Sequence, residues 1–196
     1  MPDRITDELL LERAGGGDQA AFLELYQRHR DAVFRFAYRF LGSVEKAEDI
    51  THDCFLGLIR NPGNFEPGRA SLRTYLYSAA RNLSFKQYRL SEREGSFEEL
   101  TLEPHVTARQ QPLSQLLDEE LIIKVREAVS ALPPLQREAL VLFEYQELPL
   151  NEIANVVGTD VGAVKARLHR ARQRLRRALE PYLNSSREIV TLEQAK

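Results

Sequence analysis

The sequence predicts an all-α protein made of two small helical domains joined by a flexible acidic linker, with a helix-turn-helix in the C-terminal domain. Apolar residues recur at helical i, i+3, i+4 spacing along most of the chain, and no alternating strand pattern persists. Residues 91–112, by contrast, are acidic, contain two prolines and show little periodicity. We therefore expect domains at 1–90 and 113–183, the linker between them, and a frayed tail over 184–196.

The first domain is expected to hold four helices. A short N-terminal helix precedes three consecutive glycines, and Asp18 can cap a long helix that ends at Gly42. Ser43 can open a third helix. A loop at 61–68 with two Pro-Gly pairs then separates it from a fourth helix, which Ser71 can cap.

The second domain is expected to contain a helix from about Leu113, a helix after Pro133-Pro134 and a helix-turn-helix at 151–177. Gly158 tolerates the left-handed backbone that ends a helix, and Thr159 or Asp160 can cap the next one. The buried stripe of that next helix comprises Val164, Leu168, Ala171, Leu175 and Leu179. Off the stripe lie Lys165, Arg167, Arg170, Arg172, Arg174, Arg176 and Arg177. This layout is typical of a recognition helix that enters the major groove of DNA.

Charge and cysteine usage narrow the class of protein. The formal net charge is −2, with the basic excess confined to the C-terminal helix, so the chain is not a uniformly basic nucleic-acid binder. Cys54 is the single cysteine, so no intrachain disulfide can form, and its apolar neighbours indicate a buried group. No apolar run can span a bilayer, and the N-terminus lacks the layout of a signal peptide. We expect a cytoplasmic protein without membrane insertion.

No metal, cofactor or catalytic residue is expected. Asp49 and His52 are spaced to ligate one ion from a helix, but a real site needs more ligands than these two. His29, His105 and His169 show no complementary spacing to carboxylates. No nucleophile–base pair or Gly-rich phosphate loop stands out either.

Three segments match, in order, those of a known family. AEDITHDCFLGLIR (47–60) is similar to a polymerase-binding helix, SLRTYLYSAARNLSFKQYR (71–89) to a −10 promoter-recognition helix, and residues 132–172 to a −35-binding domain. Over about residues 18–179 the chain thus resembles the extracytoplasmic-function (ECF) group of bacterial RNA polymerase sigma factors. The resemblance implies a non-catalytic protein that binds core RNA polymerase and promoter DNA, directs initiation at promoters, and is controlled by an anti-sigma factor.

The resemblance also implies three binding surfaces. The core polymerase surface would be an acidic patch with an apolar centre that meets the coiled coil of the largest subunit: Glu48, Asp49, Asp53 and Leu56. The −10 surface would consist of Phe65, Arg69, Tyr75, Tyr77 and Asn82, because aromatic and amide groups hold unstacked bases. For Tyr75, packing in the core explains the aromatic side chain as well as contact with a base does. Three further cations could hold the DNA backbone there: Arg73, Arg81 and Lys86.

The −35 surface would consist of Lys165, Ala166, Arg167, His169, Arg170 and Arg172. Lys165 and Arg170 can donate to guanine, and Ala166 can touch a thymine methyl. Arg167 and Arg172 better suit phosphates, which position the protein without specifying sequence.

Other functions stay open. A helix-turn-helix repressor would bind duplex DNA alone and would not need the N-terminal helices. An interaction protein with a sigma-like fold is kept open by departures from the family pattern. Tyr75 replaces a usual Trp, Lys86 replaces an acidic residue, Pro149-Leu150 replaces a Ser/Thr-aromatic pair, and Ala163 and Ala166 replace hydroxyl residues. An enzyme fits least.

Overall fold

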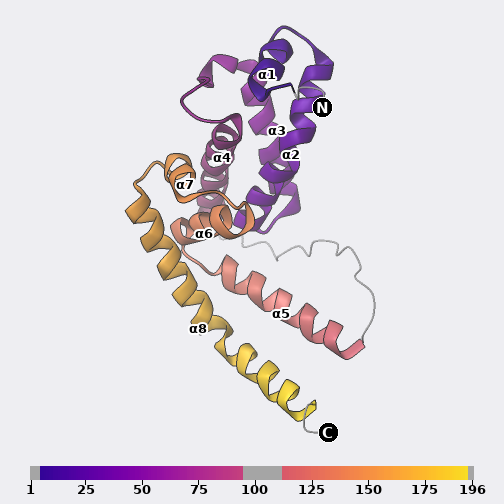
Figure 1. Cartoon of the computed structure of the whole chain (residues 1–196), viewed down its shortest axis with the longest axis vertical. Helices are drawn as coiled ribbons and strands as arrows, with labels where there is room; N and C mark the ends of the chain where they lie inside the picture. Colours follow the sequence, from indigo (N-terminus) through magenta and orange to yellow (C-terminus); the bar gives the residue numbers. More distant parts are fainter. Residues whose placement is uncertain (1–4, 95–111, 194–196) are drawn as a thin grey trace.

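The computed structural model describes residues 5–94 and 112–193, and all regular structure within these ranges is helical (Figure 1). The N-terminal domain consists of α1 (Asp7–Gly15), α2 (Gln19–Leu41), α3 (Val44–Arg60), a 3-10 turn η1 (Pro62–Asn64) and α4 (Leu72–Glu94). The C-terminal domain consists of α5 (Pro112–Ser130), α6 (Pro134–Leu140), a π-helical turn η2 (Val141–Tyr145), α7 (Leu150–Val157) and α8 (Val161–Glu193). The predicted all-α, two-domain architecture is confirmed.

Side-chain caps set the helix boundaries, as the sequence indicates. Asp18 Oδ1 accepts hydrogen bonds from the backbone amides of Ala20 and Ala21 at 3.0 and 3.1 Å. The Ser43 and Ser71 hydroxyls each accept from the amide three residues later. These bonds satisfy amides that the first helical turn leaves without partners.

Two helices run further than the sequence predicts. α4 continues to Glu94, past the expected domain end at residue 90, because no Gly or Pro interrupts residues 91–94. α8 continues to Glu193 through Pro181, although a frayed tail was expected from residue 184. The rest of the predicted linker (95–111) and of the tail (194–196) lies outside the described residues.

The N-terminal core forms where α2 packs against α1, α3 and α4. Phe36 and Phe40 of α2 are fully buried, as are Leu58 of α3 and Leu76 of α4. Cys54 is buried as predicted, and burial raises the pKa of its thiol to about 12.

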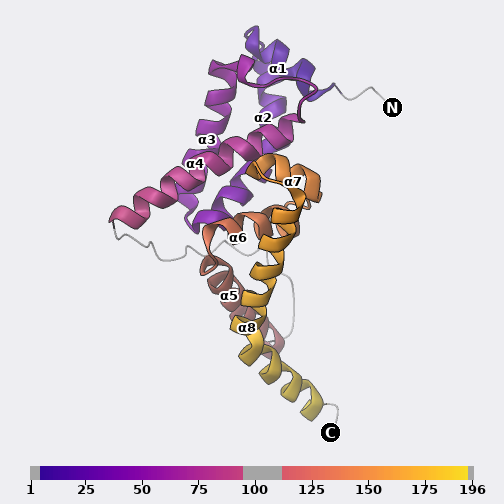
Figure 2. The same cartoon turned by 90° about the vertical axis from the view of Figure 1, so that its left-hand side faces the viewer.

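The apolar core continues from one domain into the other. Leu142, Leu148 and Ile153 of the C-terminal domain belong to the same buried cluster as Phe36 and Tyr77 of the N-terminal domain. Accordingly α6 and α7 lie against α2 and α4 in both views, whereas α5 and α8 extend away from the junction (Figures 1 and 2). None of the described helices has the length and apolar character needed to cross a membrane.

Candidate nucleic-acid interface

The helix-turn-helix forms where the sequence predicts it. Gly158 ends α7 in the left-handed region, with φ 67°. The Asp160 carboxylate then caps α8 by accepting a hydrogen bond from the Ala163 amide at 2.9 Å. A Cβ on Gly162 would lie 2.9 Å from the same carboxylate oxygen, so a glycine leaves room for the cap. Gly158 and the Asp160 cap therefore fix the turn between α7 and α8.

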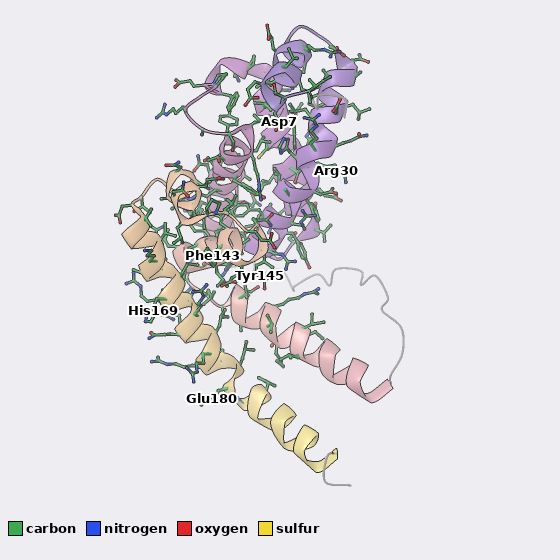
Figure 3. The ribbon with its side chains drawn as sticks, in the orientation of Figure 1. Asp7, Arg30, Phe143, Tyr145, His169 and Glu180 are labelled. Atoms are coloured by element: carbon green, nitrogen blue, oxygen red, sulfur yellow. The ribbon has the colours of Figure 1, made fainter. Side chains whose placement is uncertain are left out.

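One side of α8 is available to a ligand. Val164, Leu168 and Ala171 are buried, which confirms the predicted stripe over this part of the helix. Four of the predicted −35 residues are exposed on the other side: Lys165, Ala166, His169 and Arg170. His169 points outward from α8, away from the domain junction marked by Phe143 and Tyr145 (Figure 3).

The other two predicted −35 residues already have carboxylate partners. Arg172 pairs with Glu144 at 2.7 Å, and both side chains are about half exposed. Arg167 pairs with Glu138 at 2.8 Å, and its side chain is only 18% exposed. A DNA phosphate would have to displace these carboxylates to reach either guanidinium.

The predicted −10 residues divide into exposed and buried ones. Asn82 and Arg69 are exposed. Tyr75 is half-buried and meets the Phe65 ring edge-on, with ring centroids 5.8 Å apart. Phe65 itself is 5% exposed, so it supports Tyr75 from the core instead of offering a free face to a base.

Tyr77 does not fit the expected role of a base-stacking residue. Its side chain is 1% exposed, its ring packs against Phe36, and its hydroxyl donates a 2.8 Å hydrogen bond to Gln146 of the C-terminal domain. Burial raises the pKa of the Tyr77 hydroxyl, which remains a neutral donor. The periodicity of α4 could not reveal this position, because a second domain covers a face that a single-helix pattern leaves open.

The acidic surface of α3 is arranged as expected. Glu48, Asp49 and Asp53 are exposed and Leu56 is half-buried beside them, opposite the buried side of the helix. Within the part of the chain that the structure describes, none of these three carboxylates joins an ion pair. Residues 5–94 and 112–193 also contain no group of three His, Cys, Asp or Glu side chains placed to hold a metal ion.

Sequence reasoning missed the polar residues of the domain junction. Glu138 is fully buried and accepts from Arg81 Nε at 2.5 Å and from Arg167 Nη1 at 2.8 Å. Arg137, 7% exposed, donates to the Phe40 carbonyl at the end of α2 at 2.6 Å. The pair of adjacent charged residues, Arg137 and Glu138, in the mainly apolar segment after Pro134 is the sequence signal that could have revealed this junction. Charged residues are rarely buried without partners.

The π-helical turn η2 positions a further junction residue. Its last residue precedes Gln146, and Glu147 then adopts φ 54°, a left-handed conformation uncommon for a residue with a side chain. This path turns the backbone carbonyl and the side-chain oxygen of Gln146 toward α4. The Gln146 carbonyl accepts from Arg73 at 2.6 Å, and its side chain accepts from Tyr77.

Comparison with known families agrees with this anatomy. Residues 25–94 match the family model of sigma-70 region 2, and residues 122–175 match that of sigma-70 region 4. Together the two matches define a sigma factor of the sigma-70 type. The chain is 32% identical to the ECF RNA polymerase sigma factor SigW of Bacillus subtilis, over 83% of this chain and 91% of the relative. It is 29% identical to the RNA polymerase sigma-H factor of Pseudomonas aeruginosa, over 92% and 97%. The chain belongs to the ECF family of sigma factors.

Two solved structures of similar fold are complexes with a partner chain. CnrH in complex with the cytosolic domain of CnrY is similar with a TM-score of 0.67 and 26% identity, over 89% of this chain and 97% of that one. The sigma factor RpoE of Bartonella quintana, in complex with the anti-sigma factor NepR, gives a TM-score of 0.63 and 26% identity, over 77% and 91%.

Proposed function

We propose that this chain binds core RNA polymerase and directs it to promoters by reading a −35 element with α8 and a −10 element with α4 and the loop before it. The observation that carries the proposal is the presence, on one chain, of an outward-facing basic recognition helix and of a region 2 domain whose α3 has an exposed acidic face. The protein acts in the cytoplasm as a transcription regulator and catalyses no reaction itself.

At the −35 element, Lys165 and Arg170 donate to base edges in the major groove, with Ala166 and His169 beside them. All four side chains are exposed early on α8, where a recognition helix lies deepest in the groove. Arg167 and Arg172 bind phosphates after Glu138 and Glu144 release them.

At the −10 element, Asn82 reads an unstacked base, and Arg69 and Lys86 hold the backbone, since all three are exposed. Tyr75 offers the accessible part of its ring. Phe65 and Tyr77 support this surface from within the core.

The acidic face of α3 binds the polymerase. Glu48, Asp49 and Asp53 provide charge and Leu56 an apolar centre, which suits a basic, partly apolar partner such as the coiled coil of the largest subunit. An anti-sigma factor controls the protein, a role supported by the anti-sigma factor NepR that is bound to the similar sigma factor RpoE.

The test is transcription by core RNA polymerase with and without the purified chain, using a genomic library as template and sequencing the transcript ends. We expect new start sites that share −35 and −10 sequences. A matched chain carrying Lys165→Ala and Arg170→Ala should lose them while still binding polymerase. Start sites that are the same with and without the chain would contradict the proposal and favour a repressor or an interaction protein.

A further inference from the structure

One buried carboxylate connects the two helices assigned to DNA. Glu138 of α6 is 0% exposed and accepts from Arg81 on α4 and from Arg167 on α8, at 2.5 and 2.8 Å. Arg81 approaches with a second nitrogen at 3.5 Å, and both arginine side chains are less than 20% exposed. The two guanidiniums thus meet at a single anion.

An anion held by two arginines has the chemistry of a bound phosphate. Guanidinium groups match carboxylates and phosphates with the same fork of N–H donors, so one anion can replace the other. We propose that Glu138 acts as an internal substitute for DNA phosphate, which holds Arg81 and Arg167 and keeps the free sigma factor closed until DNA or polymerase separates the domains. The DNA part of this inference rests on the proposed function of α4 and α8, whereas the closed contact does not.

The contact extends along one face of α4. Arg73, Tyr77 and Arg81 are spaced four residues apart and therefore share a face. Arg73 and Tyr77 both donate to Gln146, and the Thr74 hydroxyl donates to Glu152 of α7 at 3.4 Å. The C-terminal domain therefore occupies two of the cations, Arg73 and Arg81, that α4 offers to a DNA backbone.

The closed form cannot span a promoter. One base pair rises about 3.4 Å, so elements centred near −35 and −10 lie on the order of 85 Å apart along straight duplex DNA. In the closed chain, residues of both α4 and α8 contact the Glu138 carboxylate. Binding of both elements by one chain therefore requires the Arg81–Glu138 contact to break.

Several features of the domain junction lower the stability of the closed state. Burial raises the pKa of Glu138, which reflects the cost of keeping this carboxylate away from water. Gln146 Nε2 and Arg137 Nε are buried without a hydrogen-bond partner among the described residues, which further weakens the closed state. A groove of about 520 Å³ lined partly by Arg89, Arg167 and Arg170 opens beside the contact, so a phosphate can approach Arg167 from solvent.

Two matched substitutions test the inference on the full-length chain. Glu138→Gln removes the charge that joins the domains, whereas Glu144→Gln removes one charge from the same domain and frees Arg172 without touching the N-terminal domain. Both variants change the net charge equally. Small-angle X-ray scattering of the free proteins reports the separation of the domains, and circular dichroism reports whether the helices persist.

We expect Glu138→Gln to increase the radius of gyration and Glu144→Gln to leave it unchanged. A duplex of arbitrary sequence at low salt is the DNA probe, because phosphate contacts need no promoter. Glu138→Gln should bind it up to roughly tenfold more tightly, since apparent affinity scales with the open fraction. Its salt dependence should steepen by about one unit for each arginine released.

Equal scattering by Glu138→Gln and the parent, with helicity intact, would overturn the inference. Equal gains in DNA binding by both variants would also overturn it, because charge alone would then explain the gain. If Glu138→Gln unfolds, Arg81→Gln and Tyr77→Phe break the same junction from the N-terminal domain, and each must then increase the radius of gyration. A failure of promoter-directed transcription, by contrast, would leave the scattering result standing and would contradict only the proposed function.

Discussion

Both α8 and α4 are proposed to bind promoter DNA, but they differ in how much of their surface is exposed to solvent. α8 buries one stripe and turns its basic side to solvent, with Lys165 and Arg170 exposed. α4 is covered on two faces, by its own core and by the C-terminal domain, which leaves a narrow strip around Asn82 and Lys86. On the proposed function, the base-reading side of the −35 surface is therefore preformed, whereas we expect the −10 surface to be completed only when the domains separate.

The largest effect is expected on the preformed surface. Lys165→Ala and Arg170→Ala should each cost about 1–3 kcal/mol at one base pair and relax sequence choice there, because exposed donors early on α8 read base edges. Binding to single-base variants of a selected promoter measures this preference.

Arg174→Ala is the matched control for these two variants. Arg174 is exposed but lies nine residues beyond Lys165 along α8, where the helix leaves the groove. Its loss should weaken all sequences evenly and reduce the salt slope by about one unit. A change of base preference in Arg174→Ala alone would show that the assigned register of α8 is wrong.

A smaller effect is expected at α3, whose acidic side neither domain covers. Asp49→Ala combined with Asp53→Ala should weaken binding to core polymerase by on the order of 1 kcal/mol or more, since both carboxylates are exposed and unpaired among the described residues. Pull-down titration measures the affinity, and circular dichroism should show unchanged helicity. Glu45→Ala, an exposed carboxylate in the first turn of the same helix, is the control; equal losses in both would point to nonspecific attraction.

On α4, Asn82→Ala should reduce promoter melting more than it reduces initial DNA binding, because an unstacked base exists only after melting. Permanganate footprinting on the polymerase complex reports the melted bases. Tyr77→Phe sharpens the comparison, since it removes only the buried hydroxyl that bonds to Gln146. We expect normal melting from Tyr77→Phe, and equal melting by Asn82→Ala and the parent would rule out the role of Asn82.

The smallest effect is expected away from both α4 and α8, where Asp7 joins α1 to α2 through ion pairs with Arg28 and His29 at 2.9 and 2.7 Å. Burial acts to raise the pKa of Asp7, but hydrogen bonds from Arg28 and His29 outweigh it, and the pKa is lowered from 3.8. Because the fold favours the carboxylate, this stabilisation is present above about pH 4 and is lost as the pH falls through the lowered pKa.

Asp7→Asn should accordingly lower the free energy of unfolding by about 1 kcal/mol at pH 7 and by less in acid. Chemical denaturation at pH 7 and pH 3 measures both values. Asp31→Asn, an exposed carboxylate on α2, should change stability by no more than about 0.5 kcal/mol. A loss for Asp7→Asn that is the same at both pH values would contradict the assignment.

The elements of the fold follow from local chemistry. Asp18, Ser43, Asp160 and the left-handed Gly158 could be predicted to bound helices, because each acts within three residues along the chain. The buried stripe of α8 was predictable for the same reason. The exposed positions of the α3 patch followed from its helical period.

The domain junction could not be predicted, because its contacts join residues far apart in sequence. The Tyr77–Gln146 and Arg81–Glu138 bonds span 69 and 57 positions, and no periodicity encodes them. The expectation that Tyr77 holds a base failed in the structure for this reason: the face of α4 that looked free is the face that the second domain covers.

The central claim is that the C-terminal domain covers part of α4, so that the proposed −10 surface is complete only when the two domains separate. Dyes on Arg89→Cys of α4 and Leu135→Cys of α6 report the separation by single-molecule energy transfer, because both positions are exposed and line one groove between the two domains. Buried Cys54 should stay unlabelled because its thiol pKa is about 12. We predict one short-distance population in the free chain that shifts to a long distance when core polymerase and promoter DNA form an open complex. The same distance in the free chain and in the open complex would contradict the account.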